Sequence, residues 1–276
     1  MSFVTRFAPS PTGYLHRGHA LSALTAFEAA RAAGGRFILR IEDIDATRRR
    51  PQYEAAIYED LAWLGLAWET PVRRQSEHLA DYRAALGRLR DEGLVYRCFR
   101  TRREILDSIG EAPHGLPPPF RGARLDALEE QRRLAGGEPY AWRLSLEAAR
   151  SRLGERWDDL TYVEEGKGAL HADPADAGDI VLARKDVGVA YHLAVVVDDA
   201  LQGITQVIRG EDLAEATPVQ RLLQTLLDLP APRYRHHRLL LGPDGKRYAK
   251  RDQAETLRAL RTAGMTPRTL RRQIGV

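Results

Sequence analysis

Cysteine is almost absent from this chain of 276 residues, which contains one cysteine and two methionines. A single cysteine excludes an internal disulfide framework and is typical of proteins that work in a reducing cytosol. The sequence also lacks any apolar run approaching the roughly 18 residues of a membrane span. Its N-terminus lacks the basic segment and following apolar segment of a secretory signal. We therefore expect a cytoplasmic protein that does not associate with a membrane.

The remaining composition is that of an ordinary globular protein. Hydrophobic residues make up 43% of the chain and charged residues 29%, which suits one large or two small domains with a substantial core. The formal net charge is +4, and this mild basic excess is compatible with a polyanionic partner. Charge alone gives only a slight preference for nucleic acid, so the function has to be inferred from motifs.

The N-terminal stretch predicts a strand, a tight loop and a helix in succession. The apolar residues 3–7 favour a strand, two prolines and Gly13 interrupt it, and the run 18–33 is rich in the good helix formers alanine and leucine. Such an arrangement directs free backbone N–H groups and the positive end of the helix dipole towards an anion. This pattern by itself is weak evidence for a nucleotide site.

Two histidines at the start of the predicted helix make the nucleotide interpretation stronger. His16 and His19 lie where a triphosphate could accept hydrogen bonds from both rings, and Gly18 between them has no side chain to prevent close approach. The alternative is a pair of surface histidines in a loop with no role in binding.

A second predicted strand over residues 36–43 completes a βαβ unit, which requires parallel strands and a right-handed crossover. Ser10 follows the first strand and Glu42 ends the second, so both should converge on the crevice where open α/β sheets bind ligands. Because Arg40 and Glu42 share one face of their strand, a buried ion pair is the alternative role for Glu42.

The middle of the chain is less regular. Residues 51–66 and 76–92 have the apolar spacing of two helices. From Leu94 to about His171 the pattern loosens, with a possible helix over 125–134 and a strand over 140–146. We interpret this region as an insertion into a larger α/β domain.

Apolar runs typical of buried strands return in the C-terminal half. We expect strands over 179–184, 191–199 and 204–208, the second of them apolar enough for a central parallel strand. Thr217, as a capping residue followed by proline at the first helical position, then begins a helix. Arg209 lies at the end of the third strand, where its guanidinium could bind a carboxylate with two hydrogen bonds. A structural salt bridge is the alternative role.

A basic segment follows a Pro-Asp-Gly turn at 243–245. Residues 246–251 contain a dense group of lysine and arginine, which could bring a lysine onto phosphate oxygens as pyrophosphate leaves. Taken alone, a solvated surface turn is the simpler interpretation. The tail over 254–276 predicts one or two short helices and is too small for another domain.

Together these motifs resemble the class I aminoacyl-tRNA synthetases, specifically the catalytic part of the glutamyl branch. The segment 16–19 resembles the His-x-Gly-His element, and 246–251 resembles the mobile lysine loop. The blocks that resemble the glutamyl type are residues 6–13, 40–43, 191–199 and 207–212. The sequence ends where a full glutamyl-tRNA synthetase would begin its anticodon-binding region. In this respect it resembles the truncated glutamyl-queuosine tRNA(Asp) synthetases.

The resemblance implies an α/β fold, a Rossmann-like parallel-sheet class I synthetase catalytic domain with an inserted smaller α+β subdomain and a short C-terminal helical segment. We expect the catalytic domain in two halves, 1–95 and 173–252, the second of which carries the lysine loop. The acceptor-binding insertion is expected over 96–172 and the helical C-terminal segment over 253–276.

The resemblance also implies an activity, which is ATP-dependent activation of L-glutamate and its transfer to the queuosine base at the wobble position of tRNA(Asp). Mg²⁺ is expected to accompany ATP, and the protein is expected to be a monomer, as the family is usually described. Two alternatives stay open: a short glutamyl ligase with a different acceptor, and a catalytically impaired RNA-binding paralogue.

The site residues that the resemblance implies fall into three groups. Arg209, with Arg6, would bind a substrate carboxylate, and Glu42 would accept from the α-ammonium group. The full glutamate pocket corresponds to Arg6, Ala8, Ser10, Glu42, Tyr191 and Arg209. The ATP site corresponds to Pro9, His16, Gly18, His19, Arg247 and Lys250. The expected catalytic residues are His16, His19 and Lys250.

Two departures from the family pattern affect the expectations. In the lysine loop, Arg247 replaces the usual lysine and Ala249 replaces a small hydroxyl residue, which could reduce turnover. In the insertion, Cys98 is the only cysteine, and Arg100 occupies the position of its usual partner. Since a tetrahedral zinc site needs about four ligands, we predict that zinc is absent and that Cys98 is a buried small hydrophobic residue.

Overall fold

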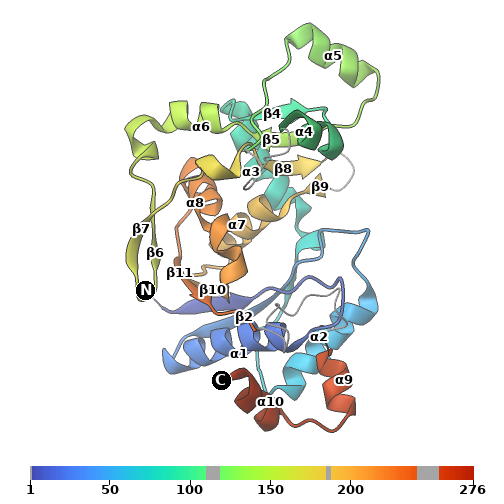
Figure 1. Cartoon of the computed structure of the whole chain (residues 1–276), viewed down its shortest axis with the longest axis vertical. Coiled ribbons are helices and arrows are strands. Elements are labelled where there is room, and N and C mark those ends of the chain that lie inside the picture. Colours follow the sequence, from blue (N-terminus) through green and yellow to red (C-terminus); the bar gives the residue numbers. More distant parts are fainter. Residues whose placement is uncertain (1, 110–118, 185–187, 241–254) are drawn as a thin grey trace.

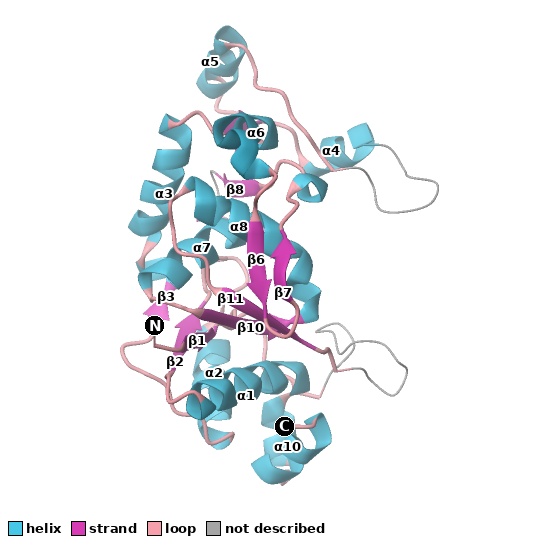
Figure 2. Cartoon of the chain, turned by 90° about the vertical axis from the view of Figure 1, so that its left-hand side faces the viewer, coloured by secondary structure: helices cyan, strands magenta, loops and turns pink. Residues whose placement is uncertain are grey.

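The computed structural model describes residues 2–109, 119–184, 188–240 and 255–276. Within these ranges the strands form three sheets, one of which lies apart from the others in the upper half of Figure 1. The two parallel sheets lie in the lower half, where helices from both ends of the chain pack around them (Figures 1 and 2). Among the described residues, no helix is both long and apolar enough to cross a membrane.

The predicted βαβ unit is confirmed. Strands β1 (Val4–Phe7) and β2 (Arg36–Ile41) pair in parallel with Val4 opposite Arg36, and α1 (Arg17–Ala32) connects them. The following elements are α2 (Pro51–Trp63), β3 (Arg73–Arg74), the 3₁₀ turn η1 (Gln75–Glu77) and α3 (Leu79–Asp91). The helices predicted over 51–66 and 76–92 are therefore also confirmed.

A second parallel sheet continues the first. It contains β10 (Gln206–Gly210), β11 (Arg233–His237), β6 (Thr161–Glu164) and β7 (Gly168–His171), of which only β7 is antiparallel. The backbone N–H of Thr205 donates to Val4 O at 2.9 Å, and the Arg6 guanidinium reaches Ile208 O at 3.5 Å. Strand β10 thus runs beside β1 in the same direction, so the carboxyl ends of β1, β2 and β10 meet at one edge.

The third sheet is antiparallel and belongs to the insertion. Its strands are β4 (Val95–Cys98), β5 (Ala141–Leu144), β8 (Val181–Arg184) and β9 (Gly188–Val189). The helices and 3₁₀ turns of this part of the chain are α4 (Arg102–Ile109), α5 (Ala127–Ala135), α6 (Leu146–Leu153), η2 (Gly154–Trp157) and η3 (Ala175–Ala177). The helix predicted over 125–134 and the strand over 140–146 are confirmed by α5 and β5.

One buried carboxylate ties this sheet to its loops. Asp179 accepts hydrogen bonds from the Tyr96 hydroxyl at 2.8 Å, from Gly122 N at 2.9 Å and from Leu146 N at 3.0 Å. Beside it, Cys98 is 6% exposed and packs in a small apolar cluster with Tyr96, Ile105 and Phe120. The expectation that Cys98 is a buried small hydrophobic residue is confirmed.

The central strand predicted over residues 191–199 is wrong, because this segment is the helix α7 (Tyr191–Leu201). Every residue from Leu193 to Asp199 is buried, since the helix is enclosed by α3, α8 and β8. An apolar run that is covered on all sides has no polar face, so periodicity cannot distinguish a helix from a strand. The β-branched valines here favour a strand locally, and burial overrides that preference.

Strand pairing crosses the predicted domain limits. Strands β8 and β9 follow residue 172 but complete the sheet of the insertion, whereas β6 and β7 precede that residue and join the parallel sheet. The strand predicted over 204–208 is confirmed by β10, while β6, β7 and β11 were not predicted. Since β6 and β7 have few buried residues, their hydrophobic pattern is weak. The domain limits themselves stay a prediction.

The C-terminal helices cover the lower face of the βαβ unit. After β10 come the 3₁₀ turn η4 (Glu211–Ala216) and α8 (Thr217–Leu226). The predicted helix is confirmed, but the capping role of Thr217 is wrong, because Ala216 is the N-cap residue and Thr217 is the first helical residue. The tail forms α9 (Leu257–Thr262) and α10 (Pro267–Ile274), separated near Gly264 as predicted. Their leucines join the core of α1, β2 and α2. The predicted Pro-Asp-Gly turn at 243–245 lies outside the described residues.

Candidate active site

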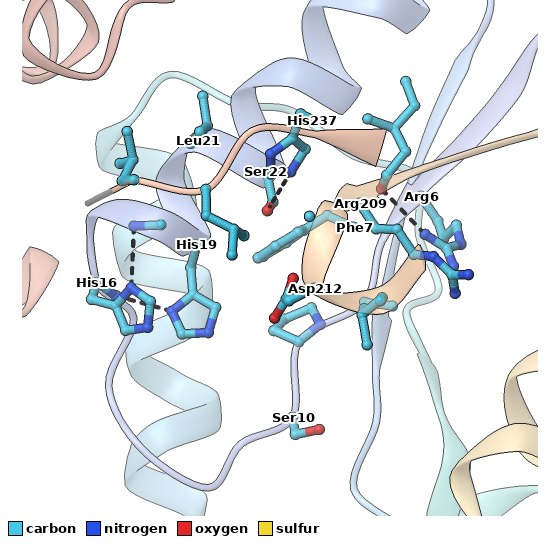
Figure 3. Close-up of a pocket in the computed structure, with 18 of the residues that line it drawn as sticks. Arg6, Phe7, Ser10, His16, His19, Leu21, Ser22, Arg209, Asp212 and His237 are labelled. Atoms are coloured by element: carbon cyan, nitrogen blue, oxygen red, sulfur yellow. Dashed lines mark hydrogen bonds between the residues drawn. The ribbon is translucent and has the colours of Figure 1, made fainter. Parts of the chain in front are cut away.

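A hollow of about 560 Å³ opens at the edge where β1, β2 and β10 end, a size within the usual range for small-molecule sites. Figure 3 shows the histidines of α1 at one side and the two arginines at the other. The predicted residues that line it are Arg6, Ala8, Pro9, Ser10, His16, Gly18, His19, Glu42, Tyr191 and Arg209. The other two, Arg247 and Lys250, lie outside the described residues.

Arg6 is neutralised by the protein itself. Its Nε donates to Asp199 Oδ1 at 3.1 Å, and both side chains are buried. Arg40, which is 0% exposed, donates to the same oxygen at 2.7 Å. Burial alone would raise the pKa of Asp199, but the two guanidinium groups lower it. The predicted contact of Arg6 with a substrate carboxylate would therefore have to share this arginine with Asp199.

Glu42 both forms an ion pair and faces the hollow. Arg40 Nη2 donates to Glu42 Oε1 at 3.0 Å, which is the buried ion pair expected from their spacing. The side chain also lines the hollow. Burial raises the pKa of this carboxyl group, against the influence of Arg40 and Arg6. An ammonium group placed in the hollow would supply an additional positive charge and favour the ionised form.

Arg209 differs from Arg6 because its hydrogen-bond partners among the described residues are all neutral. Its Nη1 donates to Gln220 Oε1 and its Nη2 to Thr217 Oγ1, both at 2.8 Å, and its Nε donates to His236 Nε2 at 3.1 Å. The residue is 5% exposed. A buried cation without a described carboxylate partner is costly, and an anion bound in the hollow would offset that cost.

The two histidines hold the first turn of α1. His16 is the N-cap residue, and its Nδ1 accepts from Gly18 N at 3.1 Å. His19 Nδ1 accepts in turn from His16 N at 3.1 Å, which completes a capping box. A ring whose Nδ1 accepts must carry its proton on Nε2 when it is neutral. Both rings therefore have an Nε2–H group that can donate to phosphate oxygens.

Gly18 allows this arrangement for a steric reason. A Cβ atom at this position would lie 3.0 Å from Cε1 of His16, which is closer than ordinary van der Waals contact. Figure 3 shows the two rings adjacent at this turn, with their centroids 3.8 Å apart. The His-x-Gly-His spacing thus has a structural basis in the cap as well as a proposed role in binding.

Tyr191 enters the hollow from the first turn of α7. Burial raises the pKa of its hydroxyl, and the nearby Glu42 carboxylate contributes in the same direction. The neighbouring His192 is also buried, and burial together with Arg209 lowers its pKa to about 4. Both groups are therefore neutral near pH 7, so the positive charge at this end of the hollow comes from the arginines.

The described residues on either side of the predicted lysine loop lie near the hollow. Leu240, which precedes the undescribed residues 241–254, lines the hollow. After them, Thr256 forms a β-bridge with His16, and Leu257 N donates to Leu15 O at 2.8 Å. The described residues that flank the segment therefore lie beside the histidines.

Several side chains that shape the site were not singled out from the sequence. Asp199 neutralises Arg6, and Thr217, Gln220 and His236 hold Arg209. His237 lines the hollow and its Nε2 lies 2.8 Å from Ser22 Oγ. The histidine pair at the end of β11 was a usable signal, because polar residues at strand ends often face a ligand crevice.

The described residues contain no group of three or more His, Cys, Asp or Glu side chains that could hold a metal ion.

Comparison with known proteins identifies the family. The family model for the catalytic domain of class I tRNA synthetases for glutamate and glutamine matches residues 2–275. The glutamyl-Q tRNA(Asp) synthetase of Rhodobacter capsulatus is 46% identical over 279 positions, covering 99% of this chain and 100% of the relative. The glutamyl-Q tRNA(Asp) synthetase of Nocardia farcinica is also 46% identical, with 95% of this chain and 80% of that protein covered.

Solved structures agree with these sequence relatives. The glutamate tRNA ligase of Elizabethkingia meningosepticum, crystallised with its amino acid, superposes with a TM-score of 0.75 and 29% identity. The match covers 91% of this chain and 52% of that one, so the chain spans about half the length of the full ligase. The expected class I parallel-sheet fold is confirmed. By sequence and structure together, this chain is a member of the glutamyl-Q tRNA(Asp) synthetase family of class I aminoacyl-tRNA synthetases.

Proposed function

We propose that the protein activates L-glutamate with ATP and transfers the glutamyl group to the queuosine base of tRNA(Asp). Relatives that bear the name glutamyl-Q tRNA(Asp) synthetase cover nearly the whole chain. The single structural observation that carries the proposal is Arg209, a buried cation on the wall of the hollow whose described partners are neutral. Such a group selects a ligand that brings a carboxylate.

Glutamate would be held at its charged ends. Arg209 pairs with the side-chain carboxylate, and the buried Glu42 accepts from the α-ammonium group. Tyr191 and Ser10 add hydroxyl groups on the wall of the hollow. Opposite charges at separate points fix the orientation of the substrate as well as its affinity, which places the α-carboxylate towards the histidines.

The adenylation step needs no general base, because the α-carboxylate is already the nucleophile. One of its oxygens attacks the α-phosphorus of ATP in line, a new O–P bond forms, and the bond to the β-phosphate oxygen breaks as pyrophosphate leaves. The Nε2–H groups of His16 and His19 donate to phosphate oxygens on which charge increases. The N-terminal end of α1 favours the same anion.

Lys250 and Arg247 would add positive charge to the departing pyrophosphate. Support comes from the flanking residues, since Leu240 lines the hollow and Thr256 forms a β-bridge with His16. Mg²⁺ accompanies ATP and neutralises phosphate charge when bound. In the second step, a hydroxyl of the queuosine cyclopentenediol attacks the acyl carbon and an ester bond forms. The bond from that carbon to the phosphate oxygen breaks, AMP leaves, and the hydroxyl proton passes to solvent.

The proposal is tested in two assays. Glutamate-dependent exchange between ATP and pyrophosphate reports the first step, and transfer of labelled glutamate to tRNA(Asp) with and without queuosine reports the second. We expect exchange, and labelling only of the queuosine-containing tRNA. Equal labelling of both tRNAs would support a ligase with another acceptor. Absence of exchange in a folded protein would support the catalytically impaired RNA-binding paralogue.

A further inference from the structure

We propose that Glu164 and His236 are positioning residues that orient Arg209 for the side-chain carboxylate of the substrate. This inference rests on the proposed function, since it concerns the residue that selects glutamate. Neither residue lines the hollow, so their effect would pass entirely through Arg209. The argument follows from strand register, proton positions and a count of hydrogen-bond donors.

Strand register places the three side chains in sequence. In the parallel pairing of β10 with β11, His236 lies directly opposite Arg209. Tyr234, two residues earlier on the same face, stacks on the His236 ring with an interplanar angle of 6° and lies 5.4 Å from the Arg209 guanidinium carbon. Strand β6 ends at Glu164, which pairs with Tyr234 and reaches His236 from the far side.

The hydrogen bonds allow one arrangement of protons. Glu164 accepts from the His236 backbone N–H at 2.9 Å, and its second oxygen lies 2.8 Å from His236 Nδ1. Arg209 always donates, so its Nε–H requires an unprotonated Nε2 on the imidazole ring. His236 must therefore be neutral, with its proton on Nδ1 donated to Glu164. A doubly protonated ring would direct an N–H group against Arg209.

Donor counting shows what this arrangement achieves. A guanidinium group has five N–H bonds, and the contacts to His236, Gln220 and Thr217 use three of them. Two remain, one on each terminal nitrogen, which is the number that a carboxylate can accept in a bidentate pair. The planar group cannot rotate without breaking the bonds to its neighbours, so its free donors are fixed in direction.

The imidazole ring also separates Glu164 from Arg209. A direct ion pair would neutralise the arginine, as Asp199 neutralises Arg6. With the ring between them, Glu164 orients Arg209 while leaving its terminal nitrogens available to an incoming anion. The same logic applies where a carboxylate orients a histidine that binds a metal ion.

Charged and titratable groups from every neighbouring strand act on His236. Glu164 and Lys167 come from β6 and its turn, Arg209 from β10 and Tyr234 from β11. Burial and the Arg209 cation lower the pKa of His236, and Glu164 opposes them. As the pH falls, protonation of His236 would disturb Arg209, so glutamate should bind more weakly in acid.

The test compares His236→Leu, which removes both ring nitrogens, with His236→Gln, whose amide can still donate to Glu164 and accept from Arg209. We expect His236→Leu to raise the KM for glutamate at least 10-fold, with kcat and the KM for ATP within 3-fold of wild type. His236→Gln should restore the KM for glutamate to within 3-fold of wild type and remove the rise of this KM in acid. Glu164→Gln should raise the KM for glutamate to an intermediate extent.

Controls separate this role from general stability and from the proposed function. His171→Leu, on the exposed strand β7, should leave all parameters unchanged. Unchanged glutamate KM in folded His236→Leu, or equal increases for glutamate and ATP, would overturn the inference. Calorimetric titration with glutamate alone measures binding at Arg209 without the adenylation step. If transfer fails while the affinity for glutamate still depends on His236, the proposed function is contradicted and the positioning role of His236 stands.

Discussion

The two ends of the hollow are constructed by different means. At the arginine end, side chains from strands and helices hold one another through buried hydrogen bonds, as in the contacts of Arg209 and Arg6. At the histidine end, His16 and His19 bind backbone N–H groups at the start of a helix. We infer that the first end selects the amino acid and the second binds phosphate, so substitutions should separate the two functions.

The largest separation is expected from Arg209→Gln. Removing one member of a buried charge pair costs about 2–5 kcal/mol, so the KM for glutamate should rise roughly 30-fold or more while the KM for ATP stays near that of wild type. Pyrophosphate exchange at varied glutamate and ATP measures both. The matched control is Arg235→Gln on the same sheet, which is 42% exposed and paired with Glu165. A glutamate KM that changes less than 5-fold would refute the assignment.

His16→Ala is expected to impair the reaction with ATP while leaving glutamate binding intact, which is the reverse of Arg209→Gln. Loss of a phosphate donor should reduce the exchange rate about 10-fold or more, and loss of the cap should cost about 1 kcal/mol of stability. Calorimetry should find glutamate affinity unchanged. His78→Ala is a matched control, because His78 is the N-cap residue of α3 but makes no side-chain capping bond. A comparable loss of exchange in both variants would contradict the phosphate role of His16.

A buried carboxylate outside the hollow provides a contrast with Glu42. Asp60 is 0% exposed, and neither of its oxygens has a hydrogen-bond partner among the described residues. The Arg261 guanidinium approaches only to 3.8 Å. Burial raises the pKa of Asp60 from 3.8 to about 6, although Arg261 opposes it. The folded state therefore favours the neutral acid.

This preference determines how Asp60 changes the free energy of unfolding with pH. The stabilisation from neutral Asp60 is complete below about pH 4 and is lost as the pH rises through about 6. Asp60→Asn should therefore increase the free energy of unfolding by roughly 1–3 kcal/mol at pH 8 and by almost nothing at pH 4. Denaturant unfolding at both values measures this. An equal gain at the two values would show that ionisation is not the cause.

The smallest effect is expected from Cys98→Ala, which removes a sulfur atom from an apolar cluster and should cost about 1 kcal/mol. Exchange activity should be retained, and chelation with EDTA should leave the melting temperature unchanged. Metal analysis of the purified protein should find no stoichiometric zinc. Bound zinc that is lost in the variant would overturn the prediction that zinc is absent.

Local patterns were sufficient to predict the βαβ unit and β10, which carry much of the site. The βαβ unit, the helix that starts near Gly18, and the end of β10 at Arg209 follow from period, helix propensity and turn residues. The parallel-strand rule then brings Ser10 and Glu42 to one crevice, and both line the hollow. Residues whose position follows from the end of a predicted strand can therefore be placed from the sequence alone.

Contacts between distant segments were not accessible in this way. Asp199 lies 193 residues after Arg6, and the helix that carries it was predicted as a strand. His236 lies 27 residues after Arg209, on a strand that the sequence did not predict. Nothing in the local pattern indicates that one arginine is neutralised and the other is not, because this depends on which elements pack together.

The register of β10 against β11 has a consequence for folding. A slip of one residue would turn His236 to the opposite face of the sheet and leave Arg209 Nε without its acceptor. Formation of this strand pair and formation of the amino-acid pocket are therefore the same event. Bound glutamate should slow amide hydrogen exchange along both strands, because it stabilises only molecules in which they are aligned.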